Sequence, residues 1–276
     1  MAIKLIEAGH ELRLWNRTPE KASIPGGHIA ASPAEAAREA EVVWVCVSDT
    51  AAAERVLLDP ADGVLHAARP GLIVADSSTI SPRASREFAA RFAERGAAFA
   101  DCPVTGSKAG AEKGELIFIA GGEPETIAKL RPLFEVMGKR VFHLGGNGMG
   151  LAAKLAMNLN IALIYEGFAE GLVLAEKSGI PVASMLEIIS ATMLRSGVVE
   201  YKGPWVERRD FSPNFPLRWM HKDIHLMLEH ARELRVKLPA LETVEEVYAV
   251  AGEEGMADLD YAATLTLLEK WAGIQV

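Results

Sequence analysis

The sequence has little of what marks a secreted, membrane-spanning or nucleic-acid-binding protein. Its 276 residues include only two cysteines, too few for a disulfide framework or a cysteine-based zinc site. No apolar run approaches the roughly 18 residues of a spanning helix, and no signal peptide opens the chain. The 29 basic residues face 37 acidic ones, which argues against a nucleic-acid-binding face. We therefore expect a cytoplasmic protein without a nucleic acid or membrane partner, with Cys46 and Cys102 as buried thiols.

What is present is the composition of an ordinary globular protein, with 50% hydrophobic and 24% charged residues. At about 150 residues per domain, the length favours two domains. A chain of this size can build a core without metal or disulfide support.

The first half alternates short β-rich runs with helical patterns. Ser32-Pro33 and Ser81-Pro82 each combine a helix-capping side chain with a proline at the first helical position. Residues 42–47 are apolar without alternation, as in parallel strands that are covered on both faces. Residues 1–148 are therefore predicted to form a doubly wound, Rossmann-type α/β domain. The strands are expected at 11–16, 41–47, 72–76, 98–102, 115–120 and 140–144.

From residue 149 onward the pattern is helical throughout. Residues 151–177 contain no proline and only two glycines, and their apolar residues recur at helical spacing. Further helical patterns follow at 181–192, 215–234, 239–253 and 261–272. We expect 149–276 to be an all-α substrate and dimerisation domain, joined to the first domain through one long helix.

The beginning of the chain is unusual. Residues 1–8 read as the second half of a helix, whereas a nucleotide-binding βαβ unit has a strand and a Gly-rich phosphate loop before that helix. We expect the functional protein to carry an upstream strand and loop that this sequence lacks. The next strand ends in Asn16, Arg17 and Thr18, where an acidic residue would select NAD. Donors and a cation there suit the 2′-phosphate of NADP, although an ordinary polar turn is the alternative.

Three further loops follow strands, at the sheet edge where open α/β folds bind ligands. They are residues 47–49, 76–79 and 101–107. In the last loop, the Thr105 hydroxyl and the backbone N–H groups of Gly106 and Ser107 could hold a carboxylate. A generic turn would have the same composition.

Two charged motifs lie in helical segments. Lys154 and Asn158 are four residues apart, so they share a helix face near the expected domain junction. A desolvated lysine can work as an acid–base group near neutral pH, although a lysine whose amine extends into solvent is the alternative. Lys222-Asp223 is a second pair inside the helical half, and charged pairs on helices are usually solvated surface. No metal site is expected, because His221, His225 and His230 fit no metal spacing with nearby carboxylates.

Taken in order, these motifs resemble those of the β-hydroxyacid dehydrogenase family, which includes 3-hydroxyisobutyrate dehydrogenases and glyoxylate/succinic semialdehyde reductases. The resemblance covers essentially the whole chain. It is carried by residues 8–18, residues 76–82, the run Asp101-Cys102-Pro103-Val104-Thr105-Gly106, the pattern Gly148-x-Gly150-x-x-x-Lys154-x-x-x-Asn158, and Lys222-Asp223.

The resemblance implies a role for each matched position. Lys154 exchanges the proton with the carbonyl oxygen, and Asn158 orients Lys154 and the substrate. The substrate is held by Thr105, Gly106, Ser107, Phe215 and Asp223. The cofactor is held by Asn16, Arg17, Thr18, Val47, Ser48, Thr79 and Lys222.

Within the family, Gly106-Ser107-Lys108 and Phe215-Pro216-Leu217 are most similar to the glyoxylate/succinic semialdehyde reductases. The sequence thus predicts NADPH-dependent reduction of small aldehyde acids to hydroxy acids by a homodimer or homotetramer, with NAD as a possible cofactor. The alternatives are a dehydrogenase of 3-hydroxyisobutyrate or another β-hydroxyacid, and a non-enzymatic binding module that has lost its phosphate loop. An imine reductase fits less well, because Lys154 suits a carbonyl substrate.

Overall fold

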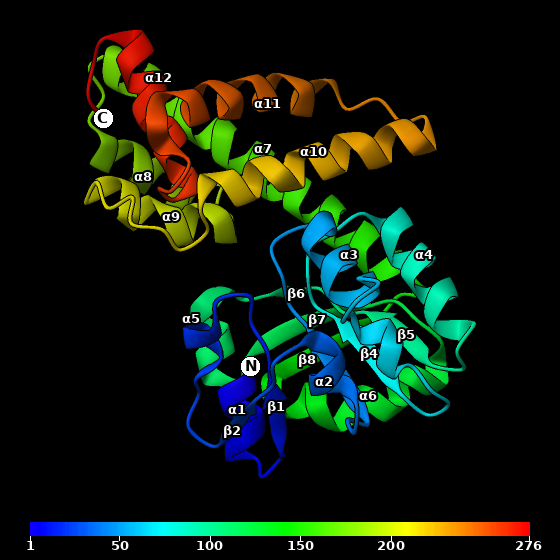
Figure 1. Cartoon of the computed structure of the whole chain (residues 1–276). Coiled ribbons are helices and arrows are strands. Elements are labelled where there is room, and N and C mark those ends of the chain that lie inside the picture. The colour runs from blue at the N-terminus through cyan, green and yellow to red at the C-terminus, as the bar shows by residue number, and fades with distance from the viewer. The chain divides into compact units, whose positions relative to one another are not determined.

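The computed structural model describes all residues from 1 to 276 and divides them into two compact units (Figure 1). The first unit is Met1–Lys154 and the second is Leu155–Val276. This division falls within one long helix, a few residues after the boundary at 148 that the sequence suggested. The two units are described separately below.

The first unit contains short, mostly parallel sheets. The strands are β1 (Leu12–Leu14), β2 (Gly27–Ile29), β3 (Val42–Val45), β4 (Ile73–Asp76), β5 (Ala98–Asp101), β6 (Val104–Thr105), β7 (Leu116–Ala120) and β8 (Gly138–His143). They form three sheets, of order β1-β2, β3-β4-β5 and β6-β7-β8, in which only β6 and β7 are antiparallel. Every strand that the sequence predicts is present, and β2 and β6 are additional.

Helices flank these strands. They are α1 (Ala2–Glu7), α2 (Pro33–Ala37), α3 (Thr50–Leu58), α4 (Pro82–Ala93), α5 (Ser107–Lys113) and α6 (Pro124–Met137). The expected caps are confirmed: Ser32 Oγ accepts from Glu35 N–H at 3.1 Å, and Ser81 Oγ accepts from Ala84 N–H at 3.5 Å. These caps fix where α2 and α4 begin, after the loops that follow β2 and β4.

Strand β4 shows why this is a doubly wound domain. All four of its residues are buried. Val74 packs into one apolar cluster with Phe88 and Phe99, whereas Ile73 and Ala75 belong to a second cluster. Alternate residues therefore face two separate cores, as expected for a parallel strand with helices on both faces.

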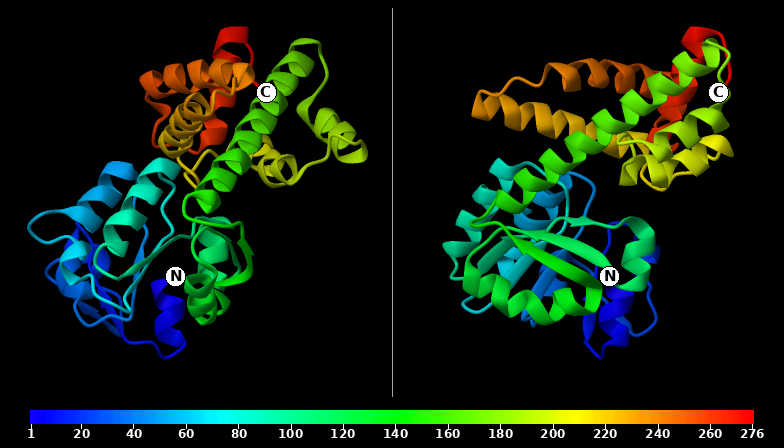
Figure 2. Two further views of the ribbon diagram at one scale, coloured as in Figure 1. Left: turned by 90° about the vertical axis from the view of Figure 1, so that its right-hand side faces the viewer. Right: turned by 180° about the vertical axis from the view of Figure 1, so that it is seen from behind.

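The second unit is helical. Its elements are α7 (Met149–Lys177), α8 (Val182–Ala191), α9 (Gly197–Glu207), α10 (Leu217–Leu234), α11 (Pro239–Ala251) and α12 (Thr264–Ala272), with short turns of other helix types before α12. Figure 2 shows α7 as the longest helix, and its first residues belong to the first unit. The sequence did not predict α9, because Gly203-Pro204 interrupts its helical pattern.

Two expectations from the composition can be compared with the structure. Cys102 is buried, but Cys46 is exposed, so the expectation of two buried thiols was wrong for Cys46. The reason is that β3 ends at Val45 and leaves Cys46 in the following loop. None of the helices combines the length and apolar character needed to cross a membrane.

Candidate active site

The end of β1 forms a polar turn. Asn16 Oδ1 accepts a hydrogen bond from Thr18 N–H at 2.9 Å, and this turn leaves Arg17 exposed between the two residues. A hollow of about 290 Å³ lies beside it, lined by Trp15, Asn16 and Ile29 among others. Arg17 thus places an exposed cation in the turn that borders this hollow.

The loops after β3 and β4 are tied to each other. Val47 N–H donates to Ser78 Oγ at 2.8 Å, and Ser78 N–H donates to Asp76 Oδ1 at 2.8 Å. The structure therefore brings the expected cofactor positions Val47, Ser48 and Thr79 to the same edge of the β3-β4-β5 sheet. Ser48 Oγ donates to Asp49 Oδ2 at 2.7 Å, and Asp49 caps α3 through its other oxygen.

Residues 105–107 form a sharp reversal between β6 and α5. Gly106 has φ of +126° and Ser107 has φ of +58°, so two successive residues occupy the region that favours glycine. Thr105 is half-buried, whereas Gly106 and Ser107 are exposed. A hydroxyl and two exposed backbone groups within three residues are a suitable set for a small carboxylate.

The start of α7 is held by a carboxylate whose role the sequence analysis missed. Asp101, at the end of β5, is fully buried. Its Oδ1 accepts from Gly148 N–H at 2.7 Å and its Oδ2 accepts from Leu151 N–H at 2.9 Å. Burial raises the pKa of Asp101, and these N–H groups oppose that rise. Asp101 thus fixes the helix turn that precedes Lys154.

Close packing explains two glycines of the same segment. A Cβ at Gly150 would lie 2.4 Å from Ile119 O and 2.9 Å from Asp101 Oδ2. Gly148 has φ of +86°, and a Cβ there would lie 2.8 Å from Pro82 O. The pattern Gly148-x-Gly150 is therefore what lets α7 begin against the sheet. Lys154 follows Gly150 by one turn and is 8% exposed.

The second unit contains a buried polar cluster. Asn158 Nδ2 donates to Asp223 Oδ2 at 2.7 Å, and Lys222 Nζ lies 2.9 Å from Asp223 Oδ1. Asn158 and Asp223 are each 2% exposed, so the interpretation of Lys222-Asp223 as a solvated surface pair was wrong for Asp223. The position of Asn158 on α7 is consequently fixed by α10.

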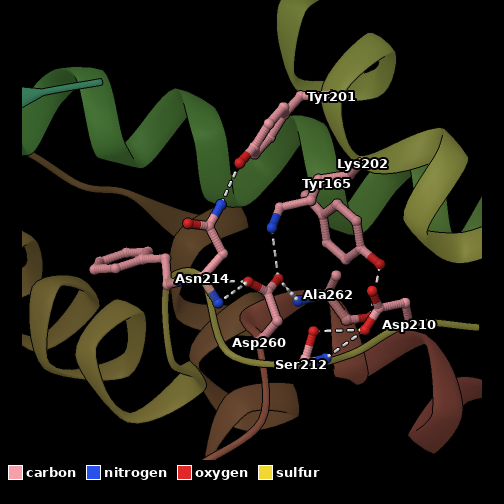
Figure 3. Close-up of polar contacts among 9 residues, drawn as sticks. Tyr165, Tyr201, Lys202, Asp210, Ser212, Asn214, Asp260 and Ala262 are labelled. Carbon is pink, nitrogen blue, oxygen red and sulfur yellow. Dashed lines mark hydrogen bonds and ion pairs between the residues drawn. The ribbon is translucent and has the colours of Figure 1, made fainter. Parts of the chain in front are cut away.

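A second buried ion pair sets the conformation before α10 (Figure 3). Asp260 Oδ1 accepts from Lys202 Nζ at 2.7 Å, while its Oδ2 accepts from the N–H groups of Asn214 and Phe215 at 3.2 and 3.0 Å. Lys202 also lies 4.7 Å from the centre of the Tyr261 ring. Burial lowers the pKa of Lys202, and Asp260 opposes that change. The pair thus anchors the loop that carries Phe215.

Sequence reasoning missed both members of this pair and one further group. Lys202 and Asp260 gave no signal beyond a charge within an apolar segment. Glu245, on α11, lies next to His221 and His225 of α10. The sequence showed no metal spacing of these histidines with nearby carboxylates, because Glu245 reaches His221 and His225 from a different helix.

Comparisons with known proteins agree with this organisation. Residues 1–145 match the family described as the NAD binding domain of 6-phosphogluconate dehydrogenase. Residues 148–268 match the family described as the NAD-binding domain of NADP-dependent 3-hydroxyisobutyrate dehydrogenase.

Individual relatives cover nearly the whole chain. It is 34% identical to the probable mitochondrial 3-hydroxyisobutyrate dehydrogenase-like 1 of Arabidopsis thaliana, over 99% of this chain and 82% of that protein. It is 33% identical to glyoxylate/succinic semialdehyde reductase 1 of the same plant, over 96% and 92%. The structure of Mycobacterium tuberculosis 3-hydroxyisobutyrate dehydrogenase with L-serine superposes with a TM-score of 0.88 at 31% identity, over 96% and 93%. The chain therefore belongs to the β-hydroxyacid dehydrogenase family of NAD(P)-dependent oxidoreductases.

Proposed function

We propose that this enzyme uses NADPH to reduce small aldehyde acids, of the glyoxylate and succinic semialdehyde type, to hydroxy acids. The observation that carries the proposal is the arrangement of the first three turns of α7. There, a buried Lys154 precedes by one turn an Asn158 that Asp223 holds through a 2.7 Å hydrogen bond. A buried ammonium group with a fixed polar neighbour is suited to protonating a carbonyl oxygen.

In this proposal each residue has one task. The Lys154 ammonium donates a proton to the aldehyde oxygen in reduction and accepts it back in oxidation. Asn158 commits its Nδ2 to Asp223, so its Oδ1 is the atom that can accept a hydrogen bond from the ammonium. When bound, the nicotinamide cofactor supplies the hydride. Phe215, anchored through Asp260, contributes an apolar wall for the substrate.

In this proposal, one set of residues binds the substrate and another binds the cofactor. Thr105 together with the backbone at Gly106 and Ser107 holds the substrate carboxylate. The residues assigned to the cofactor are Asn16, Arg17, Thr18, Val47, Ser48, Thr79 and Lys222. Their charge suits the 2′-phosphate that distinguishes NADP from NAD, because Arg17 is an exposed cation and the end of β1 carries no carboxylate. NADP is therefore proposed over NAD.

A substrate panel tests the function. NADPH consumption is followed with succinic semialdehyde and with butanal, which has the same carbon chain but no carboxylate. We expect succinic semialdehyde and glyoxylate to be reduced with a higher kcat/KM than butanal, because only they can use the Thr105 loop. Equal rates for succinic semialdehyde and butanal would contradict the assignment of that loop.

The second candidate is oxidation of 3-hydroxyisobutyrate or a related β-hydroxyacid. It is favoured by the match of residues 148–268 and by the superposition on the mycobacterial enzyme. Adding 3-hydroxyisobutyrate with NADP⁺ to the panel distinguishes the two, because a higher kcat/KM for it than for either aldehyde acid with NADPH would favour this candidate.

A further inference from the structure

Two histidines and a carboxylate converge on one surface of the helical unit. His221 and His225 lie one turn apart on α10, with their ring centroids 4.4 Å apart. Glu245 approaches them from α11. Its Oε1 is 3.1 Å from His221 Nε2 and 3.0 Å from His225 Nε2. One potential ligand atom from each of the three residues lies within 4.8 Å of the others.

The helix pair provides a rigid support for this cluster. The ring centroids of His221 and of fully buried Tyr248, on α11, are 6.4 Å apart, and Ile224 is buried beside them in α10. The side chains of His221 and Glu245 are 22% and 27% exposed, whereas that of His225 is 59% exposed. The cluster is therefore backed by the core on one side and open to solvent at His225.

The donor set has the chemistry of a transition-metal site. Two histidines at i and i+4 on one helix are the spacing by which zinc enzymes present imidazoles, and imidazole with carboxylate suits Zn²⁺ better than Mg²⁺ or Ca²⁺. Glu245 Oε1 lies within hydrogen-bond distance of the Nε2 atoms of both histidines, and an ionised carboxylate is the form that binds a metal ion. The group thus offers one anionic oxygen and two imidazole nitrogens.

The two distances between histidine and glutamate ligand atoms need only a small adjustment. Ligand atoms about 2.0–2.1 Å from a tetrahedral zinc ion are about 3.4 Å from each other. The two histidine-to-glutamate separations of 3.1 and 3.0 Å fall short of that by a few tenths of an ångström. Zn²⁺ would bind the Nε2 lone pair of each neutral imidazole in the tautomer that has its proton on Nδ1, and water would complete the fourth position.

We propose that His221, His225 and Glu245 bind a divalent transition-metal ion of the Zn²⁺ class, which links α10 to α11. Magnesium and calcium do not use this site. Metal binding would stabilise the packing of α10 against α11. Lys222 and Asp223 also lie on α10. The proposal does not depend on the substrate or on the cofactor of the enzyme.

The test uses the full chain, freed of metal with a chelator and then titrated with ZnCl₂ alone. We expect one Zn²⁺ per chain by equilibrium dialysis and elemental analysis, and a higher Tm in its presence. Co²⁺ in the same site should show the d–d absorption of a low-symmetry, four-coordinate ion. Zero stoichiometry, or equally strong binding of Mg²⁺, would overturn the proposal.

Variants show whether these three residues are the ligands. His225→Ala removes the most exposed ligand, so the fold should persist, and Zn²⁺ affinity should fall by roughly 100-fold or more. Glu245→Gln should weaken binding similarly. His230→Ala is the matched control, because His230 lies on the same helix with Glu233 at 3.4 Å but belongs to no such cluster. Unchanged Zn²⁺ binding in His225→Ala, with its circular dichroism spectrum intact, would refute the assignment.

Discussion

At the scale of single residues, Lys154 combines burial with a fixed neighbourhood. It is 8% exposed and lies between Gly150, which packs against the sheet, and Asn158, which Asp223 holds. The helix is therefore held in place before and after Lys154, and a fixed backbone helps to position the ammonium group that this residue carries.

Lys154→Ala should therefore lower kcat by roughly 10²–10⁴-fold, the usual contribution of a positioned acid–base group. Cofactor affinity should change little, because the binding groups proposed above do not include this side chain. Steady-state kinetics and NADPH titration measure the two effects. Lys129→Ala, at an exposed position of α6, is the control. Near-normal turnover in Lys154→Ala would disprove the assigned role.

Arg17 is expected to determine the choice of cofactor. A charge-assisted contact with a 2′-phosphate contributes roughly 1.5–3 kcal/mol, so Arg17→Ala should lower kcat/KM for NADPH by roughly 10- to 100-fold and leave NADH unaffected. Arg91→Ala, an exposed arginine of α4, serves as the control. Equal losses with both cofactors, or no preference in the unaltered enzyme, would contradict this role.

At the scale of elements, two glycines on α7 differ in the space that a side chain would have. A Cβ at Gly150 would collide with Ile119 O at 2.4 Å, whereas a Cβ at Gly167 meets nothing within 4 Å. The backbone near Gly150 can only respond by moving α7 away from the sheet, because the colliding atom belongs to a strand.

We predict that Gly150→Ala lowers the free energy of unfolding by about 1–3 kcal/mol or more, through overpacking. Gly167→Ala, on the same helix, should raise it by about 0.4–1 kcal/mol, because alanine restricts the unfolded chain. Urea unfolding measures both. Equal effects of the two substitutions would show that helix propensity, and not the contact with the sheet, decides the outcome.

At the scale of the whole molecule, the stability of the enzyme should depend on pH through Glu166. This glutamate of α7 is 3% exposed, and its Oε2 accepts from Thr264 Oγ1 at 3.2 Å. Burial raises its pKa from 4.5 to about 7 in the folded state. The folded protein thus binds more protons than the unfolded chain between these two values, so stability falls as pH rises through that interval.

The Glu166→Gln variant should lack this effect. We expect it to be more stable than the unaltered protein near about pH 8, by up to about 3 kcal/mol, and similar to it near about pH 4. Denaturant unfolding across this range gives the comparison. Glu187→Gln, at an exposed position of α8, should leave the pH profile unchanged. Parallel profiles for the Glu166 variant and the unaltered protein would contradict the prediction.

The helical unit should also associate with a second copy. Several of its large apolar side chains are exposed, among them Leu174 at 71%, Met193 at 97% and Trp271 at 56%. Apolar surface of this kind favours burial in a homodimer or homotetramer. Sedimentation equilibrium at micromolar concentration should show a dimer or larger species, and Leu174→Glu should shift it toward monomer. A monomeric unaltered protein would rule this out.

How much the sequence predicts depends on the range of the interaction. Ser32 and Ser81 act on residues three positions away, so their caps and the helices that they open were predictable. The strands, the helical second half and the motifs around Lys154 were predictable for the same reason, because their signals lie in contiguous residues.

The tertiary structure decided which distant partners meet. Asp101 binds the start of α7 across 47 and 50 residues, Asn158 meets Asp223 across 65, and Glu245 meets His225 across 20. No local pattern specifies such pairs, because each depends on how two separate elements pack. Sequence alone therefore determined most of the elements and the family of this protein, and folding determined which carboxylates hold its buried polar groups and its histidine pair.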